Sequence, residues 1–131
     1  MGTEPSIELE HFLHGDLDPA CFHHADHVCT AFEILRRHEF MEAAEIYSRG
    51  LKQLARKAGR PGGYHETITL AFLSLIAERS AAGRFADFES FAAANPDLME
   101  KSVLARWYAP ERLNSEIARR TFVLPDPRAV P

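Results

Sequence analysis

The sequence has few cysteines and no long apolar run. Its 131 residues include two cysteines, Cys21 and Cys29. On one helix, eight residues at about 1.5 Å each would separate them by about 12 Å, beyond the roughly 7 Å that a disulfide spans. We therefore expect free thiols and a cytoplasmic location. No basic start followed by an apolar segment opens the chain, and no run approaches about 18 apolar residues, so neither secretion nor a membrane partner is predicted.

Net positive charge and complete catalytic signatures are also missing. The chain has 15 basic and 19 acidic side chains, a formal net charge of −4. Non-specific nucleic-acid binding depends on a basic surface that releases counterions from phosphates, so no nucleic-acid partner is predicted. The sequence contains no glycine-rich phosphate loop, nucleophile elbow or kinase motif. It therefore assigns no reaction, and enzymatic activity is neither predicted nor excluded.

The remaining pattern is that of an all-α protein. No segment alternates as a strand does, and apolar residues instead recur at helical spacing. A helix beginning at Asp18 and Pro19 is expected, because an N-cap aspartate followed by proline favours a helix start. We predict a compact antiparallel bundle of about five to six helices in one domain, residues 18–121. The helices are expected at about 18–38, 40–58, 64–82, 85–94, 98–108 and 110–120.

Two tails flank this domain in the prediction. Residues 1–17 show no sustained period and are expected to form a tail or an arm laid over the domain. Residues 122–131 contain three prolines and are expected to be extended. The helix at 64–82 is apolar nearly all round, so we expect it in the middle of the packing.

Histidines are the most unusual feature of the chain. Five of the seven lie between residues 11 and 27. At about 100° per residue, His24 falls within about 40° of the stripe formed by Val28, Ala31 and Leu35, and His27 is about 60° away. Both side chains are therefore predicted to point inward.

An inward pair at positions i and i+3 can bind one metal ion, and His65 at the entry of the central helix is the predicted third ligand. Such a set suits zinc, iron or copper. The same imidazoles could instead bind a small polar ligand, act in acid–base chemistry, or be hydrogen-bonded structural groups. Tyr64 and Glu66 are expected to assist at the site. Trp107 is either a ligand-stacking platform or an aromatic lid on the bundle.

Several segments together resemble a group of small bacterial proteins of unassigned function. The segments are Phe22-x-His24-x-Asp26-His27-Val28, Tyr64-His65-Glu66-Thr67-Ile68-Thr69 and Leu104-Ala105-Arg106-Trp107-Tyr108. The resemblance covers most of the chain after residue 20 and implies a single domain. It implies no activity, substrate or cofactor.

Two functions follow from these patterns. The first is a histidine-lined site that binds a metal ion or a small polar molecule, with catalysis compatible with it. The alternative is a helical protein-interaction module, because residues 40–51 resemble one tetratricopeptide hairpin, although no second copy follows. A homodimer through the central helix or the Trp107 region is compatible with either function.

Overall fold

Helix α4 (Glu66–Ala81) lies in the middle of the structure, as its apolar character predicts. The computed structural model describes residues 6–127. In it, α4 packs against α2 (His24–Arg37), α3 (Phe40–Lys57) and α7 (Glu116–Arg120). Its Leu73 side chain is fully buried. Apolar residues on several faces of α4 therefore contact different elements, which explains why the helix shows no single apolar stripe.

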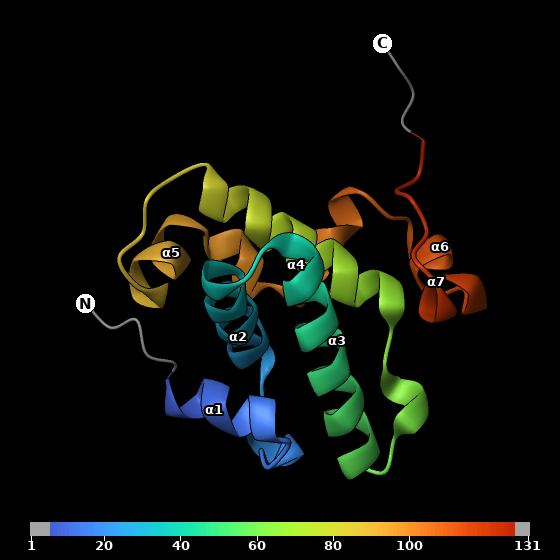
Figure 1. Cartoon of the computed structure of the whole chain (residues 1–131). Helices are drawn as coiled ribbons and strands as arrows, with labels where there is room; N and C mark the ends of the chain where they lie inside the picture. The colour runs from blue at the N-terminus through green and yellow to red at the C-terminus, as the bar shows by residue number, and fades with distance from the viewer. Residues whose placement is uncertain (1–5, 128–131) are drawn as a thin grey trace.

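Helices α2 and α3 form an antiparallel pair, and α4 lies across both of them (Figure 1). Among residues 6–127 there is no strand, and the all-α prediction is confirmed. No helix in this range has the length and apolarity needed to cross a membrane. The other elements are α1 (Ile7–His14), α5 (Phe88–Ala94), α6 (Pro110–Leu113) and four 3₁₀ segments: η1 (Pro19–Cys21), η2 (Pro61–Gly63), η3 (Pro96–Met99) and η4 (Lys101–Arg106).

The predicted helix start at Asp18 is only a short 3₁₀ turn. The Asp18 carboxylate accepts a hydrogen bond from the Ala20 amide at 3.0 Å, as an N-cap does. The backbone is then extended at Phe22 and His23. The α2 helix starts afresh at His24, where the Asp26 carboxylate accepts from the His23 amide at 2.9 Å. The first predicted helix is thus two elements: η1 has Asp18 as its N-cap, and α2 has His23 as its N-cap, with Asp26 in its first turn accepting from the His23 amide.

The N-terminal segment predicted as a tail or an arm contains the helix α1. Ser6 caps it by accepting from the Leu9 amide at 3.1 Å, and Gly15 ends it in the left-handed conformation at φ 75°. Leu9 and Phe12 are fully buried against the rest of the core. Two helical turns are too short to show a clear period, which is why the sequence pattern missed this helix.

The C-terminal third is less regular than predicted. The expected helix at 98–108 is divided between η3 and η4, and the expected helix at 110–120 is divided into α6 and α7. Residues 121–127 are non-helical, in line with the predicted extended tail. They are nevertheless tied to the core, because the Thr67 hydroxyl donates to the Thr121 carbonyl at 2.7 Å and accepts from the Val123 amide at 3.1 Å. The last part of the predicted tail, residues 128–131, lies outside the described residues.

The close approach of α1 to α3 depends on Gly50. A Cβ atom at this position would overlap the buried ring of Phe12. We expect Gly50→Ala to lower the free energy of unfolding by about 1–3 kcal/mol, the usual cost of overpacking, although alanine favours a helix by about 1 kcal/mol. Urea denaturation measures the change. The control Gly62→Ala, whose methyl group meets nothing within 4 Å, should change stability by less than about 0.5 kcal/mol. Equal effects at both sites would contradict this packing argument.

Candidate functional site

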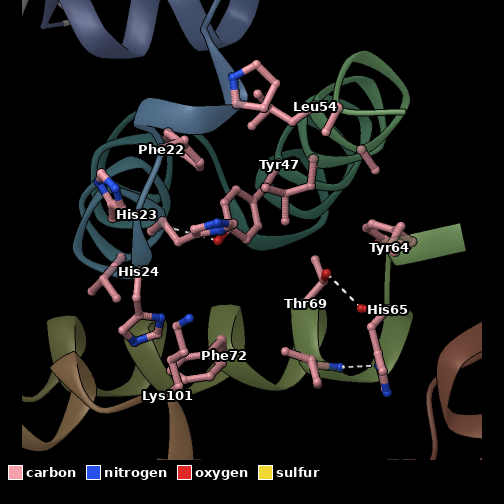
Figure 2. Close-up of a pocket in the computed structure, with 18 of the residues that line it drawn as sticks. Phe22, His23, His24, Tyr47, Leu54, Tyr64, His65, Thr69, Phe72 and Lys101 are labelled. Atoms are coloured by element: carbon pink, nitrogen blue, oxygen red, sulfur yellow. Dashed lines mark hydrogen bonds between the residues drawn. The ribbon is translucent and has the colours of Figure 1, made fainter. Parts of the chain in front are cut away.

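A cavity of about 700 Å³ lies between α2, α3 and α4 (Figure 2). We call it the histidine pocket. Its apolar lining consists of Pro19, Phe22, Val28, Leu51, Leu54, Ala55, Ala58, Ile68, Phe72 and Ile76, and its polar lining of His23, His24, His27, Tyr47, Arg60, Tyr64, His65, Thr69 and Lys101. A concave, mainly apolar surface with a few polar groups is typical of small-molecule sites, which usually measure about 300–1,000 Å³.

The apolar walls follow from helical spacing. On α3 and at its C-cap, apolar residues recur at intervals of three and four and therefore share one face: Leu51, Leu54, Ala55 and Ala58. On α4, Ile68, Phe72 and Ile76 recur every four residues. The two stripes border the same space, so this part of the lining was predictable as an apolar face, though not as a cavity wall.

His24 is held in a defined orientation at one end of the pocket. Its Nε2 atom lies 2.9 Å from the Leu98 carbonyl oxygen and donates to it, and its ring meets the edge of Phe72 at 5.2 Å between centroids. Leu98 is positioned in turn by its neighbour Asp97, which accepts two hydrogen bonds from Arg79, at 3.0 and 2.7 Å. The Nδ1 atom of His24 has no hydrogen-bond partner among residues 6–127. One nitrogen of this imidazole is therefore available to a ligand.

His27 lies beside His24 and makes no hydrogen bond through its ring within the described residues. The ring packs on Phe22, with centroids 4.5 Å apart. Burial lowers the pKa of His27 to about 4, and repulsion from His24 and Lys101 acts in the same direction. At neutral pH the side chain is thus an uncharged imidazole with both nitrogens unpaired. The inward positions predicted for His24 and His27 agree with their place in the lining.

His65 lines the same pocket, but both of its ring nitrogens have partners. Nε2 donates to the Leu113 carbonyl at 2.7 Å, and Nδ1 accepts from the Ile68 amide at 3.1 Å, which caps α4. No lone pair of His65 remains for a metal ion. In the described part of the chain, no three histidine, cysteine or acidic side chains are grouped to hold a metal. The metal site of His24, His27 and His65 stays a prediction, and in this structure His65 could join it only by giving up a hydrogen bond.

The assisting residues have different positions. Tyr64 lines the pocket at the end opposite His24 (Figure 2) and donates its hydroxyl to the Glu66 carboxylate at 2.7 Å. Glu66 is not part of the lining and touches the pocket only through this hydrogen bond to Tyr64. Trp107 is half-buried and lies outside the lining, next to Arg106, whose guanidinium is 5.6 Å from the indole ring. The position agrees with a structural aromatic residue rather than a platform for a ligand in this pocket.

Of the polar lining residues that were not identified from the sequence, Lys101, Tyr47 and Arg60 are the most informative. Lys101 comes from η4, far along the chain from the histidines, and nothing in its local sequence indicates the pocket. Tyr47 is a buried residue of α3. Its hydroxyl donates to the His27 carbonyl at 3.3 Å. Arg60, in the connection after α3, resembles an ordinary residue of a surface turn.

Comparisons with known proteins assign no family to this chain. No protein-family model matches it, and no curated protein or solved structure matches it either. The resemblance to small bacterial proteins of unassigned function therefore stays a prediction. The function has to be argued from the residues of the pocket.

The lowered pKa of His27 makes the folded state sensitive to acid. Because the pKa is about 4 in the folded protein and 6.5 as a model value, the unfolded chain binds the proton first as the pH falls. Stability is therefore full above about pH 6.5 and declines toward about pH 4. We therefore expect the free energy of unfolding to fall between about pH 7 and about pH 4.5 by about 2 kcal/mol more in the native chain than in His27→Gln. Urea denaturation at the two pH values measures this difference. The same pH dependence in both proteins would contradict the assignment.

His65 is expected to be important for stability. His65→Ala removes the cap of α4 and leaves the Leu113 carbonyl without its partner, so the free energy of unfolding should fall by about 2 kcal/mol. His14→Ala, at an exposed position, is the control and should change it by less than about 0.5 kcal/mol. Urea denaturation compares the two. A negligible effect of His65→Ala would show that its hydrogen bonds are dispensable.

Proposed function

We propose that this protein binds a small, largely apolar organic molecule in the histidine pocket. The observation that carries the proposal is the cavity of about 700 Å³ whose walls are the apolar faces of α3 and α4. Burying a ligand's apolar surface against such walls contributes roughly 25 cal/mol per Å². The few polar side chains at the ends of the pocket would then orient the molecule.

Of the two ligands predicted from the sequence, the small molecule has more support than the metal ion. A protein site for zinc usually needs three or four nitrogen, sulfur or oxygen ligands. His24 and His27 offer free nitrogens, whereas those of His65 are bound to the backbone. The sequence analysis predicted a small polar ligand, but the lining is mainly apolar and fits a ligand with a large apolar part better.

The alternative function, a protein-interaction module, has less support. It predicts a continuous exposed apolar groove on the α2–α3 hairpin. In the described part of the chain, α4 covers one side of that hairpin. The large exposed apolar side chains are instead spread over α1, the start of α3 and the C-terminal segments: Ile7, Leu13, Phe40, Met41, Ile117, Phe122 and Leu124. Scattered residues of this kind are normal on a protein surface.

Filling the pocket should abolish binding. Ala55 is part of the α3 wall, and we expect Ala55→Phe to weaken the binding of octanol by about tenfold or more, since the ring takes the ligand's space. Isothermal titration calorimetry measures the affinity, and circular dichroism checks that the variant folds. Ala93→Phe, at an exposed position on α5, is the matched control and should bind like the native chain.

Treatment with a chelator separates this proposal from the metal hypothesis. Because an apolar site needs no metal, protein that has been treated with a chelator should bind octanol with the same affinity as untreated protein. The proposed function would be overturned if neither octanol nor its charged analogues, octanoate and octylammonium, bound the native chain. It would also be overturned if Ala55→Phe bound octanol as tightly as the native chain does.

A further inference from the structure

The histidine pocket has a lining of one charge sign. Two permanent cations, Lys101 and Arg60, line it together with four histidines, and no aspartate or glutamate does so. The chain as a whole has a net charge of −4, with more acidic than basic residues. The pocket therefore departs from the average charge of the molecule. A cleft with charged walls of one sign attracts ligands of the opposite sign.

The charge at one end of the pocket is unpaired. Lys101, the first residue of η4, lies close to His24 and Phe72 (Figure 2). Its charge also lowers the pKa of His27, which places the ammonium group within electrostatic reach of that imidazole. Among residues 6–127 no carboxylate forms a salt bridge with Lys101. This cation is therefore free to bind an anion that enters the pocket.

Of the two imidazoles beside Lys101, His27 can supply a further donor and His24 is held in place next to it. His24 is held in one orientation by the Leu98 carbonyl, and its Nδ1 atom has no partner among the described residues. A neutral His27 carries one N–H group, which has no partner among the described residues. His24 is also the first residue of α2, where unpaired amide groups add partial positive charge. Asp26, whose charge acts on His27, accepts from the His23 amide and lies outside the lining.

The opposite end of the pocket is less suited to an anion. Arg60 is exposed and stands in the connection that leads to Tyr64. The Tyr64 hydroxyl already donates to Glu66, so this donor is occupied. The Glu66 carboxylate behind it would repel a second negative charge. An anionic group should therefore prefer the end formed by His24, His27 and Lys101.

From this arrangement we propose that the ligand of the histidine pocket is an amphiphilic monocarboxylate. Its carboxylate lies between Lys101 and the imidazoles of His24 and His27, and its hydrocarbon part lies along the α3 and α4 walls. A carboxylate has two oxygens and can accept from an ammonium and an imidazole at the same time. The inference rests on the proposed function, since it assigns the polar group of the same ligand.

Three probes of equal chain length test the preference for an anion. Octanoate, octanol and octylammonium share the hydrocarbon part and differ only in the charge of the head group. Calorimetry on the full native chain should show octanoate binding about tenfold more tightly than octanol, and octylammonium binding most weakly. A chain that binds octanol as tightly as octanoate would overturn the inference and leave the proposed function intact. If none of the three binds, the proposed function itself fails.

A pair of matched variants locates the head group. Lys101→Gln and Arg60→Gln each remove one exposed cation of the lining, and thermal unfolding checks that both remain folded. Lys101→Gln should remove the difference in affinity between octanoate and octanol. Arg60→Gln should leave the ratio of the octanoate and octanol affinities unchanged. Loss of the octanoate preference in Arg60→Gln alone, or its persistence in Lys101→Gln, would overturn the placement of the carboxylate.

Discussion

The burial of α4 is the constraint on which the rest of the structure depends. A helix with apolar side chains on nearly every face is stable only when other elements cover all of those faces. The α2–α3 pair covers one side, and α7 with the segment after it covers another. Two polar residues at the start of α4 are satisfied by the same covering segments, because His65 donates to Leu113 and Thr67 donates to Thr121. The C-terminal third is thus held in place by both apolar packing and hydrogen bonds.

The pocket results from the way in which α2 and α3 pack against α4. The helix α4 lies across the α2–α3 pair (Figure 1), helices that cross at an angle diverge away from the crossing, and the pocket is lined by all three. On the α3 side of the gap the wall includes Ala55 and Ala58, whose methyl groups are too small to reach Ile68 and Phe72 and close the space. Large side chains would have filled it at a gain in buried apolar area. The presence of small ones agrees with a site that leaves room for a ligand.

Helical periodicity predicts the long elements and fails for the short ones. The expected helices at 40–58 and 64–82 correspond to Phe40–Lys57 and Glu66–Ala81, because each presents several turns of pattern. The helix Ile7–His14 has only two turns, and the 3₁₀ turn at Pro19–Cys21 uses the same Asp-Pro start signal as a longer helix. The inward positions of His24 and His27 follow from their spacing alone. Lys101 could not be predicted, since only tertiary contacts bring η4 to the start of α2.

The chemistry of the three histidines is decided by partners that their own segments do not contain. Both ring nitrogens of His65 form hydrogen bonds, one with a backbone carbonyl and one with a backbone amide. One ring nitrogen of His24 is hydrogen-bonded to the Leu98 carbonyl, and the ring of His27 has no hydrogen bond within the described residues. A metal site needs a lone pair from each ligand, whereas a binding pocket needs only a few oriented polar groups. The carbonyls of Leu98 and Leu113 come from short segments whose positions depend on α4. Of the three histidines, His65 is therefore a structural residue, His24 is held in one orientation, and His27 has an unpaired ring. Only His24 and His27 can contact a ligand through a free nitrogen.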